Sequence, residues 1–268
     1  MNITIIIPAL DEAENLPHLI AAIPSLSRSQ VRSDDRSDDR SDRLRVSRPA
    51  KKAATPALAG GAGEVATTDH LEVIVADNGS TDNTAAVAGA AGARVVSEPR
   101  RGYGFACAAG VRAAESAEVI VFLDGDGSSD PAELPALLAP LREGVADLVL
   151  GSRLLEGERE REAMLPHQRF GNWLTALLMR RLYGIRVTDL GPYRAIRADL
   201  LAKLDMCEMT FGWPTEMMVK AARHGARIVE VPVSHHPRLA GRSKVSGTVR
   251  GSLLAAYFIL RTTVRYAR

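Results

Sequence analysis

Short runs of β-branched and other apolar residues recur through the first half of the chain, and each run stops at a polar or glycine-rich turn. Runs of this kind predict strands that are buried on both faces, as in a parallel sheet. The predicted strands are residues 2–7, 71–76, 93–97, 119–123 and 147–151. Helical patterns fill the intervals, at residues 15–23, 82–91, 102–115 and 131–142. This alternation predicts an α/β fold with right-handed βαβ units and a largely parallel sheet.

The regular alternation ends after Arg153. The later patterns predict two helices and two strands, at residues 167–183, 214–224, 193–197 and 227–235. A terminal helix, from about residue 247, follows a polar loop. We therefore expect one large α/β domain over residues 1–246 and a C-terminal amphipathic helix over residues 247–268.

One stretch interrupts the pattern between the first predicted helix and the second predicted strand. Residues 32–43 repeat Arg-Ser-Asp-Asp, and a stretch rich in Pro, Ala and Gly continues to about Thr68. Because these residues include almost no large apolar side chains, they cannot offset the entropy that is lost on ordering. The sequence predicts a disordered insertion over about residues 27–69, acting as a solvated spacer.

Composition narrows the class of protein. Hydrophobic residues make up 46% of the 268 residues, enough for a sizeable core. The two cysteines, Cys107 and Cys207, predict no disulfide framework and are typical of a reducing compartment. Met1 leads straight into an apolar strand, which predicts no signal peptide, and no apolar run reaches the ~18 residues of a membrane-spanning helix. We expect a cytoplasmic protein.

The net charge of +2 conceals an asymmetry along the chain. No acidic residue follows Glu230. The basic residues beyond it are Arg238, Arg242, Lys244, Arg250, Arg261, Arg265 and Arg268. A basic end without acids indicates an anionic partner, which could be a phosphate, a nucleic acid or a lipid headgroup.

The strongest chemical signal is the stretch from Val119 to Pro131, where an apolar strand ends at acids and glycines. Asp124 and Asp126 follow the carboxyl end of this strand, which is where open α/β sheets bind ligands. Two carboxylates turned to one point suit Mg²⁺ or Mn²⁺, which often share a site with substrate phosphates. A polar turn before a helix, with Asp130 as N-cap, is the simpler alternative, but it explains only Asp130.

Further acids lie at or near other predicted strand ends: Asp11, Glu12, Asp77, Asp82 and Asp189. Each of them could be a helix cap. Together with the two acids of the central stretch, however, they line one edge of the predicted sheet. A nucleotide site needs such an edge, because acids can bind the ribose and base while a metal binds the diphosphate.

These acids belong to a series of motifs that resembles the family 2 glycosyltransferases with the GT-A fold. The motifs are Pro8-Ala9-Leu10-Asp11-Glu12, Asp77-Asn78-Gly79-Ser80-Thr81-Asp82, Asp124-Gly125-Asp126 and Gly151-Ser152-Arg153. Three later motifs resemble the dolichyl- or polyprenyl-phosphate hexosyltransferase branch: Arg169-Phe170-Gly171-Asn172, Asp189-Leu190-Gly191-Pro192-Tyr193-Arg194 and Arg238-Leu239-Ala240-Gly241-Arg242-Ser243-Lys244. The resemblance covers almost the whole chain except the insertion. It implies a mostly parallel GT-A sheet with flanking helices.

The resemblance also implies roles for particular residues. The nucleotide sugar, of the GDP-mannose or UDP-glucose type, would be bound by Pro8, Ala9, Leu10, Asp11, Glu12, Asp77, Asp124, Gly125 and Asp126. Mg²⁺ or Mn²⁺ would be held by Asp124 and Asp126. Donor or acceptor phosphates would be bound by Arg153, Arg169, Arg238, Ser243 and Lys244; guanidinium groups match phosphate oxygens in bidentate fashion. The implied catalytic residues are Asp126, Arg153, Arg169 and Asp189.

The sequence departs from the family pattern in three places. Asn78 stands where the family often has a second Asp, so Asp77 is the candidate for binding the base. Ser128 stands where some relatives offer a Gln to the metal, and a neutral hydroxyl is a weaker ligand. The insertion is foreign to the pattern.

The implied activity is transfer of a hexose to a polyprenyl or dolichyl phosphate by an enzyme peripheral to the inner face of the membrane, with no nucleic-acid partner. A phosphomonoester, with its second pKa near ~6, is already anionic at pH 7 and needs no strong general base. An alcohol acceptor would need one, and Asp189 or Glu216 are the candidates. Two alternatives stay open: a family 2 enzyme with a non-lipid acceptor, such as a sugar or small phosphorylated acid, and a non-catalytic sugar-nucleotide-binding partner subunit.

Two other motifs are weak. Gly102-Tyr103-Gly104 begins only a partial G-x-G-x-x-G, because it follows a loop and lacks the final glycine. His235 and His236 are adjacent on a predicted strand, so they would face opposite sides and would not share a metal.

The C-terminal helix has two distinct faces at about 100° per residue. The face predicted to dock on the domain carries Val249, Leu253, Ala256, Leu260 and Val264. The opposite side carries an arginine stripe, with apolar residues within or beside it: Arg250, Arg261, Arg265, Arg268, Leu254, Tyr257 and Phe258. Cations among large apolar side chains suit an anionic lipid interface, so we expect this helix on the membrane surface.

Overall fold

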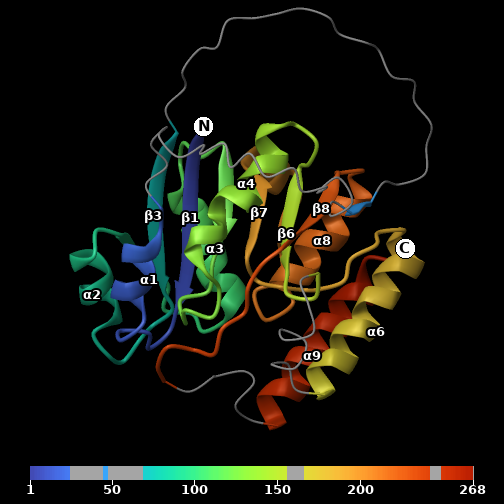
Figure 1. The fold of residues 1–268 in the computed structure, drawn as a ribbon. Helices are drawn as coiled ribbons and strands as arrows, with labels where there is room; N and C mark the ends of the chain where they lie inside the picture. Colours follow the sequence, from blue (N-terminus) through green and yellow to red (C-terminus); the bar gives the residue numbers. More distant parts are fainter. Residues whose placement is uncertain (25–44, 48–68, 156–165, 242–248, 268) are drawn as a thin grey trace, which may run out of the picture.

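A mixed sheet of eight strands forms the centre of the described chain (Figure 1). The computed structural model describes residues 1–24, 45–47, 69–155, 166–241 and 249–267. Its strands are β1 (Asn2–Ala9), β2 (Arg45–Ser47), β3 (His70–Asp77), β4 (Arg94–Ser97), β5 (Val119–Phe122), β6 (Leu148–Ser152), β7 (Arg194–Arg197) and β8 (Ile228–Pro232). Across the sheet they follow the order β2-β8-β6-β7-β5-β1-β3-β4.

Most neighbouring strands are parallel, as the alternation of strands and helices predicted. The pairs β1–β3, β1–β5, β3–β4 and β6–β8 are all parallel. β7 lies between β5 and β6 and is antiparallel to both. A strand was expected at residues 193–197, but its direction and its place in the sheet were not. The mostly parallel sheet with flanking helices is therefore confirmed, with one antiparallel strand inserted at its centre.

The helices lie close to their predicted positions. They are α1 (Leu16–Ala22), α2 (Thr84–Ala90), α3 (Tyr103–Ala113), α4 (Leu134–Arg142), α6 (Pro166–Tyr183), α7 (Ala198–Lys203), α8 (Trp213–Arg223) and α9 (Val249–Arg265). A 3₁₀ turn, η1 (Pro131–Glu133), precedes α4, and the Ala132 N–H donates to Asp130 Oδ1 at 2.9 Å. Asp130 is thus the predicted N-cap. The short helix α7 was not predicted.

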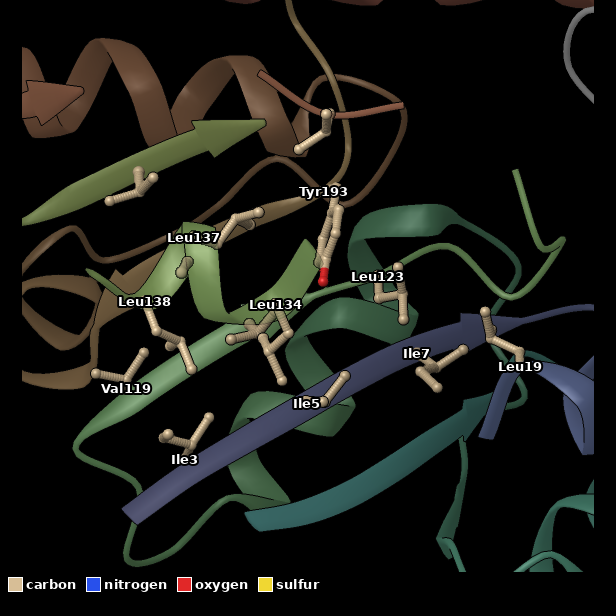
Figure 2. Close-up of a cluster of buried hydrophobic side chains, with 14 of the residues drawn as sticks. Ile3, Ile5, Ile7, Leu19, Val119, Leu123, Leu134, Leu137, Leu138 and Tyr193 are labelled. Atoms are coloured by element: carbon tan, nitrogen blue, oxygen red, sulfur yellow. The ribbon is translucent and has the colours of Figure 1, made fainter. Parts of the chain in front are cut away.

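Side chains of the central strands alternate between two cores, one on each face of the sheet. On β1, Ile3, Ile5 and Ile7 belong to the first core and Ile6 to the second. Figure 2 shows the first core, where Ile3, Ile5 and Ile7 pack with α4 side chains such as Leu137. The second core lies between the sheet and α3, α6, α7 and α8. Because both faces are buried, the strands read as continuous apolar runs.

Most of the predicted insertion lies outside the described residues. Within it, Arg45–Ser47 form β2 and pair antiparallel with β8. For these three residues the structure differs from the predicted disorder, because pairing with a distant strand leaves no signal in the local composition. At the end of the insertion, Asp69 accepts a hydrogen bond from the Met1 amino group at 2.9 Å and pairs with Arg142. The chain therefore re-enters the fold beside the start of β1.

The terminal helix α9 packs against α6 and α8, and Figure 1 shows α6 and α9 side by side. Its buried side includes Thr262 and Thr263, and the Tyr266 hydroxyl donates to Glu216 of α8 at 2.6 Å. Val264, which was expected to face the domain, is 57% exposed. At the described end of the helix the predicted docking face is therefore wrong, because Ala256 is exposed as well and a polar anchor on another side of the helix meets the domain.

The exposed side of α9 carries the mixture of residues expected at a lipid interface. Leu254 is 45% and Tyr257 58% exposed, and Arg261 and Arg265 are exposed on the same side of the helix. Among the described helices, none has the combination of length and apolar character that crossing a bilayer requires.

Replacing Gly110 by alanine is expected to destabilise the fold. Gly110 lies on α3 where the helix crosses β1, and an added Cβ would overlap Cγ2 of the buried Ile6. Overpacking costs about 1–3 kcal/mol, which exceeds the roughly 0.5–1 kcal/mol that alanine contributes in a helix. The free energy of unfolding of Gly110→Ala, measured with urea, should fall.

Gly89→Ala is the matched control. Gly89 lies on the exposed side of α2, where an added Cβ would meet only Val95 Cγ2 at 4.0 Å. This variant should be as stable as the wild type or more stable, by up to about 1 kcal/mol. A Gly110→Ala protein that is equally stable would mean that α3 is not held tightly on β1.

Candidate active site

The predicted site residues converge at one edge of the sheet because the strands that precede them are parallel. β1 and β3 end in register, with Ala9 opposite Asp77. β5 and β6 end at the same edge, and Asp124 and Arg153 follow them. Asp189 differs, because it precedes a strand. Since β7 runs antiparallel to its neighbours, its beginning lies at the edge where the other strands end, and Asp189 joins the site.

The turn after β5 holds two carboxylates. Asp124 Oδ1 accepts a hydrogen bond from the Tyr103 hydroxyl at 3.1 Å, and Asp126 Oδ1 accepts one from the Ser128 N–H at 3.0 Å. Burial, together with the negative charge of Asp126, raises the pKa of Asp124 to about 7. Two carboxylates on one turn thus repel each other in a poorly solvated place, which a bound cation would relieve.

One cation of the chain itself lies at this turn. Arg238, from the loop after β8, places Nη1 3.1 Å from Asp126 Oδ2. Its Nη2 lies 2.7 Å and 2.9 Å from the two carboxylate oxygens of Glu12. The predicted phosphate-binding Arg238 and two predicted donor-binding acids therefore form one cluster in the protein.

Arg153 and Asp189 form a second pair at the same edge. Arg153 Nε donates to Asp189 Oδ2 at 2.7 Å, and Nη2 donates to Oδ1 at 2.9 Å. The backbone N–H of Arg153 also donates to Oδ2, at 3.0 Å. The Arg153 side chain is the more accessible partner, whereas the Asp189 carboxylate is fully buried. The positive charge beside it holds the pKa of Asp189 below its usual value despite its burial.

A further layer fixes the position of Asp189. Glu230 Oε1 accepts hydrogen bonds from the Thr188 N–H at 2.8 Å and from the Asp189 N–H at 3.1 Å. Ser152 Oγ lies 2.7 Å from Thr188 Oγ1. Burial raises the pKa of Glu230 to about 7. The backbone that carries Asp189 is therefore held from β6 and from β8, and Asp189 in turn orients Arg153.

Neither carboxylate named as a base for an alcohol acceptor is available in this structure. Asp189 is bonded to Arg153, as described above. Glu216 is fully buried, and it pairs with Lys220 at 2.9 Å and with the Tyr266 hydroxyl at 2.6 Å. Its other oxygen accepts the backbone N–H groups of Cys207 and Glu208, at 2.9 and 2.7 Å. Glu216 thus tethers α9 and the preceding loop to α8.

The expected nucleoside end of the site is held together by short polar contacts. Asp11 adopts a φ of +50°, and its Oδ1 accepts hydrogen bonds from the N–H of Thr81 at 2.7 Å and its hydroxyl at 3.1 Å. The Ser80 hydroxyl accepts the Asp11 N–H at 2.9 Å, and the Ser80 N–H donates to Asp77 Oδ1 at 3.1 Å. The loops after β1 and β3 are therefore bonded to each other.

The remaining donor-binding candidates border these loops. Pro8 and Ala9 end β1, Leu10 follows them, and the Glu12 N–H donates to Thr84 Oγ1 at 2.9 Å. Gly125 lies directly against β1, since an added Cβ would stand 3.5 Å from the Pro8 carbonyl oxygen. The structure thus gathers Pro8, Ala9, Leu10, Asp11, Glu12, Asp77, Asp124, Gly125 and Asp126 at one edge.

Asn78, the departure from the family pattern, has a structural role. Its Nδ2 donates to the carbonyl oxygens of Glu98 at 3.0 Å and Arg100 at 2.7 Å, and its Oδ1 accepts the Gly102 N–H at 2.9 Å. An ionised carboxylate could not make the two donations. The amide therefore holds the loop that leads into α3.

For three predicted phosphate-binding residues, the side chains lie outside the described part of the structure. Arg169 lies on α6, but its side chain is outside the described part of the structure. Ser243 and Lys244 also lie outside the described residues.

Sequence reasoning missed three side chains near the site. Tyr103, in the glycine motif set aside as a weak signal, binds Asp124. His235 lies within electrostatic range of Arg153, and burial and this positive charge lower its pKa. Arg194, fully buried, donates to the carbonyl oxygens of Pro214, Leu190 and Gly191. Tyr103 was detectable from its place between two glycines, Arg194 from its place at the end of the motif that begins at Asp189, and His235 from the histidine pair that was set aside as a metal site.

Comparison with known proteins identifies the family. The family model described as glycosyl transferase family 2 matches residues 58–205. A protein of Mycobacterium tuberculosis called an uncharacterized glycosyltransferase is 35% identical over 257 residues, which are 94% of each chain. An undecaprenyl-phosphate mannosyltransferase of Micrococcus luteus is 35% identical over 195 residues, covering 67% of this chain and 78% of its own. The chain belongs to glycosyl transferase family 2 and is a glycosyltransferase.

The fold agrees with this assignment. Glucosyl-3-phosphoglycerate synthase from M. tuberculosis, solved with Mn²⁺, UDP and glucosyl-3-phosphoglycerate, superimposes with a TM-score of 0.64 at 22% identity. The match covers 99% of this chain and 80% of the synthase chain. The predicted GT-A fold is confirmed.

Replacing Asn78 by aspartate is expected to lower stability at neutral pH, although the family often has an acid there. The introduced carboxylate would face the Glu98 and Arg100 carbonyl oxygens without a proton to donate, at a cost of about 1–3 kcal/mol. Those oxygens and burial raise the pKa of the introduced carboxyl group in the folded state. The loss of stability should therefore grow as the pH rises above ~3.9, the pKa of an aspartate in the unfolded chain. Urea unfolding at pH 7 and pH 4.5 measures this.

Asn83→Asp makes the same chemical change at the exposed N-cap position of α2. Because a carboxylate is favourable at a helix N-terminus, stability there should be unchanged or slightly higher. A stability loss for Asn78→Asp that does not depend on pH would contradict the proposed donor role of the amide.

Proposed function

We propose that the protein transfers a hexose from a nucleotide sugar to a polyprenyl phosphate at the membrane surface, with a divalent cation at Asp124 and Asp126. The observation that carries the proposal is the meeting of acidic donor-binding loops, a carboxylate pair and two arginines at one sheet edge. Relatives support the acceptor class: besides the Micrococcus enzyme, a dolichyl-phosphate hexose transferase of Haloferax volcanii is 34% identical over 188 residues.

The carboxylate pair fits Mg²⁺ or Mn²⁺. Hard oxygen ligands on one turn are what these ions prefer, and burial and the charge of Asp126, which raise the pKa of Asp124, both disfavour its ionised form in the absence of a cation. The chain already balances Asp126 with a guanidinium group. When bound, the metal would supply Lewis-acid stabilisation of the diphosphate leaving group.

The residues of the chain have separate tasks in this reaction. The loops around Asp11 and Asp77 bind and orient the nucleoside. Asp189 holds Arg153 in a fixed orientation through Nε and Nη2, so the guanidinium places positive charge at the edge where negative charge develops on the departing diphosphate. Tyr103 fixes one oxygen of Asp124. The protein thus presents fixed positive charge and an oriented carboxylate before any substrate arrives.

The state of the two candidate bases favours a phosphate acceptor. An alcohol must lose a proton during transfer, but Asp189 and Glu216 are buried and fully engaged with cations and backbone N–H groups. A phosphomonoester is anionic at pH 7 and needs positioning only. A small phosphorylated acid, as bound by the structurally similar synthase, remains the competing acceptor class and is one arm of the test.

Membrane attachment is part of the same proposal. Leu254 and Tyr257 stand exposed among Arg261 and Arg265 on α9, and Trp173 of the adjacent α6 is 59% exposed. Such a surface can lie in the headgroup region of an anionic leaflet. We propose the inner face of the membrane, because both cysteines are free thiols, as is typical of a reducing compartment.

Asp126→Asn should abolish transfer while the protein stays folded. The amide keeps the acceptor for the Ser128 N–H but lacks the charge that binds a cation, so turnover should fall by about 10²-fold or more. The assay incubates radiolabelled GDP-mannose or UDP-glucose with a membrane lipid extract and measures label in the organic phase, with EDTA and then with added Mg²⁺ or Mn²⁺.

Asp130→Asn is the matched control, because Asn caps a helix as well as Asp does, and its transfer should be normal. A parallel reaction contains 3-phosphoglyceric acid in place of the lipid extract. If label appears only in the water-soluble product of that reaction, the acceptor is a small phosphorylated acid and not a lipid. If wild type shows no transfer and no donor hydrolysis with either donor, the result would favour the alternative of a non-catalytic sugar-nucleotide-binding subunit.

The membrane surface is tested by liposome co-sedimentation. Wild type should sediment with vesicles containing anionic lipid at low salt, and Leu254→Ser/Tyr257→Ser should sediment much less, because it loses exposed apolar contacts. Val145→Ser, at an exposed apolar residue just before β6 and so at the opposite edge of the sheet, is the control and should bind like wild type. Equal binding by the double variant would contradict the role of α9.

A further inference from the structure

Arg238 neutralises Asp126, one of the two carboxylates proposed to bind the metal. Both oxygens of Asp126 are engaged: Oδ1 accepts the Ser128 N–H at 3.0 Å, and Oδ2 pairs with Arg238 Nη1 at 3.1 Å. The other end of the guanidinium is held by both oxygens of Glu12, a carboxylate that is itself buried. The guanidinium therefore bridges two carboxylates through different nitrogens, Nη1 to Asp126 and Nη2 to Glu12, in a built arrangement and not a loose surface ion pair.

The loop that carries Arg238 is anchored on the same turn. The His236 N–H donates to the Ser128 carbonyl oxygen at 2.8 Å, and the Leu239 N–H donates to the Asp126 carbonyl oxygen at 3.3 Å. The Leu239 side chain covers Gly127 so closely that an added Cβ would stand 2.6 Å from Leu239 Cδ1. The segment His236–Ala240, called here the Arg238 loop, thus lies directly over the carboxylate turn.

A metal ion and the guanidinium cannot both be neutralised by Asp126. Two cations on one carboxylate repel each other strongly in a partly buried site, where solvent screens charges weakly. The Glu12 carboxylate offers Arg238 an alternative partner that does not depend on Asp126. Arg238 can therefore leave Asp126 without becoming an unpaired buried charge.

From this geometry we infer that Arg238 is an internal cation that competes with the metal for Asp126 and is displaced when the metal binds. The inference rests on the proposed function, because it takes Asp126 to be a metal ligand. Without the metal, Arg238 keeps the carboxylate turn neutralised and its loop closed over Gly127. With the metal, the guanidinium is released from Asp126 while Glu12 holds it beside the turn, and its Nη1 is free to meet the diphosphate of the donor.

A consequence is that metal and nucleoside diphosphate assist each other. Metal binding alone must break the Asp126–Arg238 pair, whereas in the presence of a diphosphate the displaced guanidinium gains an anionic partner. By linkage, each ligand then raises the affinity of the other by the same factor. Arg238 is thus a positioning residue that couples the two binding steps, in addition to any direct contact with phosphate.

The experiment measures Mn²⁺ binding by the loss of its free EPR signal, without any turnover. In the absence of nucleotide, Arg238→Gln should bind Mn²⁺ about fivefold or more tightly than wild type, the lower range of typical coupling. Arg238→Lys keeps a charge but has a single nitrogen in place of the two that reach Asp126 and Glu12, so its Mn²⁺ affinity should lie between those of wild type and Arg238→Gln. With UDP or GDP present, wild type should gain far more Mn²⁺ affinity than Arg238→Gln.

Arg142→Gln is the matched control, because it removes the same charge from an ion pair with Asp69 at the opposite edge of the sheet. Its Mn²⁺ affinity should equal that of wild type, and thermal unfolding verifies that each variant is folded. Wild-type Mn²⁺ binding that Arg238→Gln leaves unchanged or weakens would overturn the competition alone. Absence of Mn²⁺ binding by every variant, with and without nucleotide, would overturn both this inference and the metal site of the proposed function.

Discussion

Compensation of negative charge at the carboxyl edge of the sheet is the constraint on which the rest of the site depends. Strands buried on both faces end there in acidic loops, and these acids would repel one another without cations. The chain meets this need with two arginines: Arg153 neutralises Asp189, and Arg238 bridges Asp126 and Glu12. Asp124 has a tyrosine hydroxyl and not a cation as its direct partner, and burial together with the charge of Asp126 raises its pKa.

The antiparallel strand β7 makes this compensation possible. In an uninterrupted parallel series, a residue that precedes a strand would lie at the edge opposite the site. Because β7 is reversed, Asp189 meets Arg153, which follows β6, and Glu230 of β8 holds the backbone between them. The reversed strand also begins with the buried Arg194, whose bonds to backbone carbonyls join this turn to the start of α8.

Packing also connects the terminal helix to the carboxylate turn. Tyr266 of α9 bonds to Glu216, which accepts the N–H groups of the loop before α8. That loop packs on the start of α3, where the Phe105 N–H donates to the Met209 carbonyl oxygen, and α3 carries the tyrosine that binds Asp124. The helix proposed to rest on lipid is therefore part of one packed body with the site, which suits an enzyme whose acceptor phosphate stays at the headgroup level.

The sequence by itself determined where the strands and most helices lie. Apolar runs indicate strands that are buried on both faces, and capping residues and glycines indicate turns, and both signals are local in the sequence. It also determined that Asp11, Asp77, Asp124 and Arg153 share an edge, since parallel strands end together. Only the tertiary structure decided the direction of β7, the rotation of α9 and the partners of the charged groups. Those outcomes depend on residues far apart in the chain, such as Asp126 and Arg238, which are 112 positions apart. The local sequence shows which side chains are charged and able to pair, whereas the tertiary packing determines which of them come within bonding distance.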